Sequence, residues 1–519
     1  IKPLYADIRE AKIKKAKPED LPKDSLGIAE LGKDSILKIK SVTGYKIPEN
    51  SKGWMAYMTA ADKAAPKDGA PLILHHLSSG NEITFHNISG YQFDKSGRKI
   101  LLYKVKKEKD SADQALVLYY DMNLYRADTL SRGGADFSNF SISGDGTQVA
   151  YTAQRDSSDK ALQRFYKLWY FKEGMDSAVL IVDHNTPGMQ LGMTVSENGE
   201  TEFSKTGNRL FFGTAAIPPP KDTLTPDIDK VSVDIWNYKD DYLQPVQLAR
   251  LQRDLRENYL AVYQVQTGMV QQLGSREIPA IYKTMDGDGE KFVGVTDFGK
   301  RVESQWTGTT KKDIYAIDVS NGNRQRIKEN LDGVISPSFI SYTGKYICWF
   351  DNKTRQYWVW DGKQARNLSQ GIKTSLADEE NDVPADPPPY GIMGWQEGDS
   401  AVYLYDRYDI WKADPDLKIK PMLITAGRSR KLEYRFIKTD EEQKFFSAGP
   451  IYFLQVFDEK DKSSGLTALT LTGNRWQGIP LLKENMKLSG LVKAKKSNTL
   501  LLTKESFIAS PDVYSFRLP

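Results

Sequence analysis

Cysteine and histidine are scarce in this sequence, and both shortages restrict the chemistry open to it. Cys348 is the single cysteine among 519 residues, which excludes an internal disulfide framework and a zinc site built from cysteines. It lies within the apolar run "YICWF", so we expect a buried and unreactive thiol. The sequence has four histidines, His75, His76, His86 and His184, and therefore none within positions 185–519.

The missing late histidine bears directly on hydrolase chemistry. A hydrolase with the chain order Ser–Asp–His needs its histidine base after the nucleophile, towards the C-terminus. The sequence also has no G-x-S-x-G nucleophile elbow, no H-E-x-x-H, no P-loop and no G-x-G-x-x-G before a helix. His75 and His76 are neighbours in a predicted strand and would point to opposite faces, which disfavours a shared metal ion. We therefore predict no catalytic residue, no metal site and no cofactor in this chain.

Charge and hydropathy exclude two further classes of partner. The chain has 72 lysine and arginine residues against 68 aspartate and glutamate residues, a net charge of +4. This balance gives no reason to expect nucleic acid as a partner. No apolar stretch approaches the roughly 18 residues that cross a bilayer, so no membrane span is predicted. The chain starts at Ile1 without Met or the apolar core of a signal peptide, and we interpret it as a processed or trimmed product.

A polar turn followed by an apolar or aromatic run recurs along the chain. Glycine-containing copies include "DKSGRKILLYK", "SGDGTQVAYTA", "SKTGNRLFFGTA" and "SYTGKYICWF", and two weaker copies, "DEEQKFFSA" and "KKSNTLLLT", lack the glycine. A second strand with alternating aromatics follows most copies, as in "DIYAIDVSNG". Successive copies lie roughly 50 residues apart, a period typical of β-propeller blades.

The repeat predicts an all-β fold, a β-propeller of about seven to nine four-stranded blades. It leaves open whether the set of blades is complete at the N-terminal end. The main alternative, a row of small β-sandwich modules, would give blocks of about 100 residues joined by linkers rich in proline or glycine, and none is present. We interpret 1–40 as a lead-in segment and 41–519 as the propeller.

Two insertions, at 216–258 and 371–395, interrupt the repeat. The first contains "LQPVQLARLQRDLREN", whose apolar spacing allows a short helix. The second is rich in proline and acidic residues, and its "DPPP" must be extended or turned. Tyr390 and Trp395 follow at once and are expected to anchor this second insertion as an ordered loop.

The acidic residues Asp378, Glu379 and Glu380, with Asp382 nearby, are the candidate substrate-binding residues of the chain. Carboxylates on a loop at the mouth of a propeller could hold a substrate amine or a cation, but a solvated loop has the same composition. Another acidic stretch, "DGDGE" at 286–290, lacks the rest of a twelve-residue calcium loop and is interpreted as a polar hairpin tip.

Several segments carry a resemblance to a known family. They are "IKPLYADIREAKIKKAKPEDLPKDSLGIAELGKDS" at 1–35, "DIWNYKDDYLQPVQL" at 234–248, "DEENDVPADPPPYGIMGW" at 378–395 and "YDIWKADPD" at 408–416. In their order along the chain they resemble the propeller region of the prolyl oligopeptidase family of serine peptidases, specifically its large secreted members from Bacteroidetes-type bacteria. The tail "TKESFIASPDVYSFRL" is similar to the family's junction between the last blade and the hydrolase domain.

The resemblance implies a function that this chain performs only in part. In the family a hydrolase domain with a Ser–Asp–His triad follows such a tail, and further β repeat precedes the part that corresponds to residue 1; the resemblance implies that this chain contains neither. The chain would then be the substrate-gating propeller of a peptidase acting on short peptides, not catalytic by itself, in the periplasm or at the cell surface of a Gram-negative bacterium. Its implied partners are a peptide substrate, the hydrolase domain of the same polypeptide and other envelope proteins.

Some relatives among the dipeptidyl peptidases hold the amino terminus of their substrate with a pair of glutamates from the propeller. Glu379–Glu380 and Glu441–Glu442 are such pairs here, although neither lies in the sequence context of the family motif. The alternative function, from a different class, is a non-enzymatic propeller that serves as a binding or scaffold subunit of a cell-envelope complex.

The absence of an activated nucleophile gives a direct test of activity. We expect the 519-residue chain alone to have no peptidase turnover, because no serine has a base to deprotonate it. Incubation with proline-containing chromogenic peptides and with a fluorophosphonate serine probe measures this. Specific labelling of one serine would contradict it.

Overall fold

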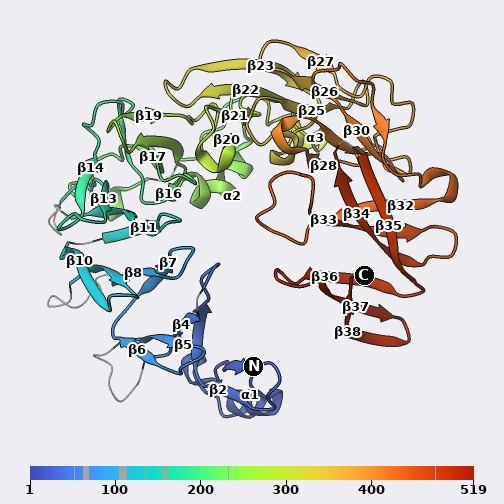
Figure 1. Ribbon diagram of the computed structural model, residues 1–519. Coiled ribbons are helices and arrows are strands. Elements are labelled where there is room, and N and C mark those ends of the chain that lie inside the picture. The colour runs from blue at the N-terminus through green and yellow to red at the C-terminus, as the bar shows by residue number, and fades with distance from the viewer. Residues whose placement is uncertain are drawn as a thin grey trace. The chain divides into compact units, whose positions relative to one another are not determined.

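The computed structural model describes residues 1–51, 53–61, 69–104, 114–134, 136–155, 161–231, 233–473 and 475–518 (Figure 1). The chain forms two compact units, which are described separately. Unit 1 comprises Ile1–Asp234 and Ala249–Ser275, and unit 2 comprises Ile235–Leu248 and Arg276–Pro519.

Unit 1 contains a two-stranded sheet and four larger sheets among its described residues, and all paired strands are antiparallel. The strands of these sheets, in chain order, are β1 (Leu26–Ala29) and β2 (Ile36–Ile39); β3 (Val42–Lys46), β4 (Trp54–Thr59), β5 (Leu72–His76) and β6 (Glu82–Phe85); β7 (Gly90–Phe93), β8 (Lys99–Lys104), β9 (Leu116–Asp121) and β10 (Arg126–Arg132); β11 (Asp136–Ile142), β12 (Gln148–Gln154), β13 (Lys167–Lys172) and β14 (Val179–Val182); and β15 (Met193–Val195), β16 (Glu202–Phe203), β17 (Arg209–Ala216), β18 (Tyr259–Gln264) and β19 (Val270–Gln272).

Unit 2 continues the pattern with four four-stranded sheets and one three-stranded sheet in its described part. Their strands are β20 (Ala280–Tyr282), β21 (Lys291–Thr296), β22 (Lys312–Asp318) and β23 (Arg324–Leu331); β24 (Gly333–Val334), β25 (Ile347–Asp351), β26 (Gln356–Trp360) and β27 (Ala365–Asn367); β28 (Ile392–Trp395), β29 (Val402–Tyr405), β30 (Ile410–Ala413) and β31 (Met422–Leu423); β32 (Leu432–Ile437), β33 (Ile451–Asp458), β34 (Ser464–Thr472) and β35 (Arg475–Glu484); and β36 (Lys487–Lys493), β37 (Thr499–Ser506) and β38 (Ala509–Arg517).

Each larger sheet is a blade, in which strands that follow one another in the chain are hydrogen-bonded neighbours, except that β15 and the two-residue β16 both pair with β17. Consecutive blades of this kind confirm the predicted fold class, an all-β protein of the β-propeller type. The repeat turns also form as predicted. Their glycines Gly97, Gly146, Gly207 and Gly344 have φ angles of 70°, 79°, 73° and 79°, which a residue with a side chain rarely adopts.

Burial on both faces explains why the sequence of the second strand of a blade is an unbroken run of apolar residues. In unit 2, all four residues of β29, "VYLY", are buried, and so are the first four of β25, "ICWF". Such strands pack on both faces against neighbouring sheets. The outermost strand β23 is instead largely exposed and polar, "RQRIKENL". The hydrophobic clusters accordingly join side chains of successive sheets, as where the β25–β26 strands meet the β28–β30 strands around Cys348 and Trp395.

Two segments fold differently from the interpretation given above, and the tail adds one further detail. Residues 392–395 belong to strand β28 and not to the insertion, because this apolar run pairs with β29. The weak repeat copy "DEEQKFFSA" is not a turn and strand; it lies in the connection between β32 and β33, and its Phe446 fills an aromatic cluster. In the tail, Pro511 lies within β38, an edge strand, where a missing N–H costs no ladder hydrogen bond.

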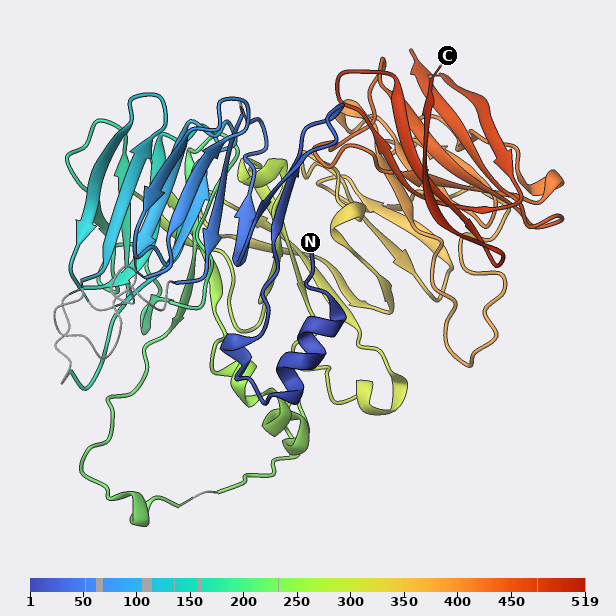
Figure 2. The same cartoon turned by 90° about the horizontal axis from the view of Figure 1, so that it is seen from below.

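The described helices are short and lie in the lead-in and the connections: α1 (Tyr5–Ile13), α2 (Gln244–Asp254), α3 (Ser304–Thr307), and the 3₁₀ turns η1 (Pro18–Asp20), η3 (Asp227–Asp229), η4 (Met285–Gly287), η5 (Pro337–Phe339), η6 (Glu397–Asp399) and η7 (Arg428–Arg430). Helix α2 confirms the helix predicted in the first insertion, of which Ser232 lies outside the described residues. Figure 2 shows the residues after β17, up to and including η3, as an extended stretch outside the sheets of unit 1.

Antiparallel pairing places two kinds of link at the same end of each blade in unit 2. The link between the second and third strands of a blade lies at the same end as the link from its fourth strand to the next blade. We call this end of the blade the connection end. It carries 297–311, 368–391, 406–409, 424–431 and 459–463. The turns between first and second strands and between third and fourth strands lie at the opposite end, the hairpin end. The second predicted insertion therefore belongs to the connection end.

Phe446 offers a test of the core packing. Its ring is 2% exposed and lies 5.0 Å from Phe436 and 4.9 Å from Tyr452 between ring centroids, and its N–H donates to the Trp395 carbonyl at 2.8 Å. We expect Phe446→Ala to lower the free energy of unfolding by about 3–5 kcal/mol, because it leaves a cavity among buried rings. The control is Phe507→Ala in the exposed tip between β37 and β38, which should change it by less than about 0.5 kcal/mol. Urea denaturation measures both, and equal effects would contradict this packing.

Candidate functional site

The acidic residues predicted from the sequence lie on the connection between β27 and β28, and two of them face arginines. Glu379 meets the guanidinium of Arg428 at two points, with Nη1–Oε2 at 3.3 Å and Nη2–Oε1 at 3.1 Å. Glu380 Oε1 lies 2.6 Å from Nη2 of Arg407. Asp378 instead stabilises the loop, since its carboxylate accepts from the Glu380 N–H at 3.0 Å. The structure therefore brings Glu379 and Glu380 into one charged group, with the side chain of Glu379 26% exposed and that of Glu380 69% exposed.

Tyr390 holds the end of this loop, as its position after the prolines predicts. Its hydroxyl accepts from the Glu379 N–H at 2.8 Å and donates to Asp378 at 3.3 Å. The guanidinium of Arg435 lies over the Tyr390 ring at 5.6 Å and over the Tyr405 ring at 5.0 Å. Cation–π contacts of this kind fix the tyrosine ring while leaving its hydroxyl for the loop backbone.

Asp406 joins the loop to the neighbouring turn. Its side chain is buried, and it accepts from the N–H groups of Tyr408 and Asp409 at 2.8 Å each and from the indole of Trp411 at 2.8 Å. The hydroxyl of Thr374 donates to it at 3.0 Å, and Arg428 forms an ion pair with it at 3.4 Å. A buried carboxylate is tolerated when its oxygens are satisfied in this way.

A pair of glutamates lies beneath the Arg407–Glu380 contact. Glu459 accepts from Arg407 Nε at 3.0 Å and from the Tyr408 hydroxyl at 2.8 Å. Burial raises the pKa of Glu433, and its hydrogen bond with Glu459 raises it further. Burial alone would also raise the pKa of Glu459, but hydrogen bonds from Tyr408 and Arg407 bring this pKa below the usual range. Burial and the shared hydrogen bond thus move the pKa of Glu433 upward, whereas the hydrogen bonds from Tyr408 and Arg407 move that of Glu459 downward.

Together these contacts define what we call the arginine–carboxylate cluster. It contains seven carboxyl groups and four guanidinium groups, namely Asp378, Glu379, Glu380, Asp406, Asp409, Glu433, Glu459, Arg407, Arg428, Arg430 and Arg435. The carboxyl groups of this set outnumber its guanidinium groups. The cluster is an ordered, carboxylate-rich group at the connection end of unit 2, in which Asp406 and Asp409 are buried, and the exposed Lys431, Lys460 and Lys462 lie on the same links.

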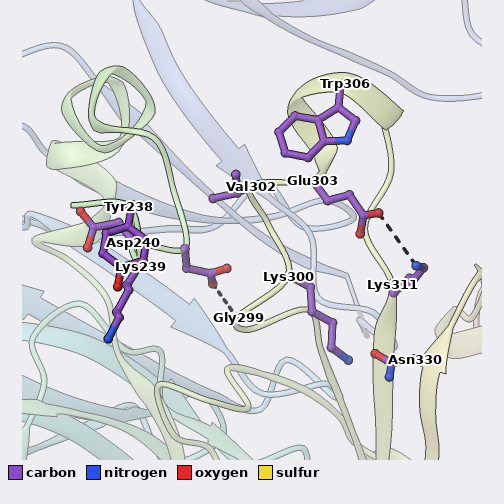
Figure 3. Close-up of a pocket in the computed structure, with 11 residues that line it drawn as sticks. Tyr238, Lys239, Asp240, Gly299, Lys300, Val302, Glu303, Trp306, Lys311 and Asn330 are labelled. Carbon is purple, nitrogen blue, oxygen red and sulfur yellow. Dashed lines mark hydrogen bonds and ion pairs between the residues drawn. The ribbon is translucent and has the colours of Figure 1, made fainter. Parts of the chain in front are cut away.

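A pocket of about 700 Å³ opens at the same end of the sheets (Figure 3). Its lining residues come from 238–241, from the β21–β22 link and from β23: Tyr238, Lys239, Asp240, Asp241, Gly299, Lys300, Val302, Glu303, Trp306, Lys311 and Asn330. Residues 238–241 form one wall of the pocket, which we call the Asp241 wall, and the β21–β22 link forms another. Asp241 joins the two walls, because its carboxylate accepts from the N–H groups of Gly299 and Arg301 at 2.9 Å each. Arg301 adds an ion pair to it at 3.1 Å.

The charges around this pocket are largely balanced within the protein. Lys300 pairs with Asp313, and Lys311 lies 3.9 Å from Glu303. Figure 3 shows Trp306 at the edge of the pocket, across from Tyr238, and both side chains are mostly exposed. The pocket therefore offers exposed aromatic surface and neutralised charge rather than a site for one strongly charged ligand.

Other residues singled out in the sequence have structural partners. His75 Nδ1 lies 3.0 Å from Glu82, whereas His76 Nδ1 contacts the Ser78 and Ser79 hydroxyls, so the two rings do not meet. Asp286 of "DGDGE" pairs with Lys444 at 2.8 Å. Within the described ranges, no group of three or more histidine, cysteine, aspartate or glutamate side chains is placed to hold a metal ion.

Cys348 is buried and reduced, and burial raises the pKa of its thiol. In the part of the chain that the structure describes, no helix has the length and apolar character needed to cross a membrane.

The sequence interpretation missed the basic half of the cluster. Arg407 and Arg428 lie 27 and more positions after Glu380, on different links, and no local pattern pairs them with the acidic loop. The nearest signal is "DRYD" at 406–409, whose last two residues begin the segment "YDIWKADPD" at 408–416. Aspartates around an arginine and a tyrosine in a four-residue turn indicate a side-chain network more than a plain hairpin.

Comparison with known proteins relates this chain to solved structures only; no family model and no curated protein matches it. A prolyl endopeptidase structure matches with 12% identity, over 81% of this chain and 55% of that one, at a TM-score of 0.32. The β-propeller domain of the Trilobed protease from Pyrococcus furiosus matches with 9% identity, over 86% of this chain and 99% of that domain, at 0.26. The tricorn protease matches with 9% identity, over 89% and 50%, at 0.32.

Several of the structural neighbours are thus peptidases. The chain spans only about half the length of the prolyl endopeptidase and tricorn protease structures that it matches.

Asp406 provides a test of the cluster as a structural unit. We expect Asp406→Asn to lower the free energy of unfolding by about 2–4 kcal/mol, since it leaves buried donors and Arg428 without their carboxylate. The matched control is Asp382→Asn on the exposed part of the acidic loop, with an expected change below about 0.5 kcal/mol. Urea denaturation compares the two variants, and a neutral Asp406→Asn would show that the buried network contributes nothing.

Proposed function

We propose that this chain is the substrate-gating β-propeller of a prolyl oligopeptidase-like serine peptidase that acts on short peptides. The observation that carries the proposal is the acid excess of the arginine–carboxylate cluster, held on an ordered loop at the connection end. Ordered carboxylates in excess of their arginines attract the ammonium group of a peptide's amino terminus. The resemblance of the sequence segments to the family points to the same role.

Glu380 is the residue proposed to meet the peptide first. Its side chain is the more exposed of the acidic pair, and its partner Arg407 also pairs with Glu459. An incoming ammonium can therefore take over part of the Glu380 interaction while Arg407 keeps a carboxylate partner. Glu379 has a two-point contact with Arg428 and contributes charge and position rather than direct contact.

Bond cleavage is assigned in this proposal to a separate hydrolase domain of the same polypeptide. The propeller would admit short or unfolded peptides and exclude folded ones and bulk water, as gating elements do in other enzymes. Action in the periplasm or at the cell surface, and contact with other envelope proteins, are part of the proposal by resemblance alone.

The proposal predicts a preference for peptides with a free amino terminus. We expect fluorescently labelled proline-containing peptides to bind the 519-residue chain more tightly when their amino terminus is free than when it is acetylated. Glu380→Gln should weaken the free form about tenfold and leave the acetylated form unchanged, because only the former loses a charge-assisted contact. Fluorescence anisotropy measures both affinities.

The control for this experiment is Asp382→Asn, which removes the same charge from the same loop outside the ion pairs. An equal loss in both variants would reduce the effect to general electrostatic attraction and contradict a role for Glu380. No binding of either peptide form would favour the non-enzymatic scaffold.

A further inference from the structure

A second pocket lies at the hairpin end of unit 2, at the opposite end of the blades from the arginine–carboxylate cluster. Its volume is about 510 Å³, and turns of three successive sheets surround it. Five of the side chains that line it are cationic, those of Lys345, Lys412, Lys418, Lys420 and Arg475. Three aspartates also line the pocket, so positive charge exceeds negative charge there.

The three aspartates are already used by the protein. Asp414 accepts from the N–H groups of Asp416, Lys418 and Ile419 at 2.9–3.0 Å and so shapes the turn between β30 and β31. Asp416 accepts from the Tyr346 hydroxyl at 2.5 Å and from Lys418 at 2.9 Å, and these two contacts lower its pKa to about 2.

Asp399, the third aspartate, accepts from the hydroxyl of Thr343. The aspartates therefore serve the turns and Lys418, and the five cationic side chains that line the pocket still outnumber its three carboxylates.

Lys412 is the cation held most firmly in place. It lies on β30, directly opposite Tyr403 on β29 and Met422 on β31. Tyr403 is fully buried, so the stem of Lys412 runs along an apolar strand face. Burial lowers the pKa of its ammonium, and the charge of Asp414 offsets this only in part. Because burial removes part of the hydration of this ammonium, a bound anion would stabilise its charge more than it would stabilise an exposed lysine.

Lys420 and Arg475 add charge at the rim. Both side chains are exposed, and among the described residues neither has a carboxylate within 4.0 Å. Arg475 begins β35, and the following residue Trp476 belongs to the aromatic cluster around Phe446, which fixes the backbone at this point. The rim cations are thus tethered close to the pocket while their charged groups remain available.

We propose that this pocket binds a small organic polyanion that carries phosphate or carboxylate groups. Lys412 would contact one anionic group from the strand face, and Arg475 and Lys420 would contact another from the rim. The apolar part of the ligand would pack on Ile419 and Met422, which are exposed beside the charges. The proposal goes beyond the peptide-gating function and uses none of its residues, so either can fail without the other.

Isothermal titration of the 519-residue chain with citrate and with pyrophosphate tests the site. We expect at least one of them to bind, with an affinity that falls as sodium chloride is added. Lys412→Met removes the ammonium and keeps an apolar stem, and Arg475→Gln removes the charge at the exposed rim. Each should weaken binding at least about tenfold, as the loss of a charge-assisted hydrogen bond does.

The matched control is Lys353→Gln, an exposed lysine in the β25–β26 turn at the connection end. It should leave the affinity unchanged. Binding of citrate alone or pyrophosphate alone supports the site and identifies carboxylate or phosphate as the preferred group. Absence of binding by both anions at millimolar concentration, or equal weakening by Lys353→Gln and Arg475→Gln, would overturn the proposal. Because Arg475 is exposed, its variant decides the matter even if Lys412→Met fails to fold.

Discussion

Face-to-face packing of one sheet on the next is the constraint on which the rest of this structure depends. A middle strand such as β29 has sheet neighbours on both of its faces, so its residues must all be apolar or aromatic and of matching volume. Hydrogen bonds within a blade satisfy the backbone, but the clusters between blades supply the apolar burial that offsets chain entropy. The strand ends and the outermost strands, such as the largely exposed β23, are not bound by this requirement.

Because the strand ends are not packed between sheets, charged side chains gather there in unit 2. Both ends carry charged side chains, yet their balance differs in sign, with carboxylates in excess around Arg407 and Arg428 and cations in excess around Lys412. The charges are held by short turns whose aspartates bind backbone N–H groups, as Asp406 and Asp414 do. One scaffold thus presents two surfaces of different electrostatic character without any change to its core.

Local patterns in the sequence are sufficient for the blades and insufficient for the site. Glycine turns followed by apolar runs report on pairing between adjacent strands, which is why the fold class, helix α2 and the anchoring by Tyr390 follow from them. "DEEQKFFSA" misled because two phenylalanines mark burial equally well in a strand and in a plug such as Phe446. Arg428 meets Glu379 across 49 positions, and no spacing rule within one segment encodes such a contact.

The path of the chain between the two units has a consequence for synthesis and for domain dissection. Residues 235–248 belong to unit 2, yet the chain returns to unit 1 before it enters unit 2 for good at Arg276. A single cut therefore never yields both units whole, and a truncation at 275/276 removes the Asp241 wall from the pocket beside Gly299. During synthesis on the ribosome, residues 235–248 emerge before the β21–β22 link that they contact. Unit 2 can therefore be completed only after that link has been made, although residues 235–248 were synthesised between two parts of unit 1.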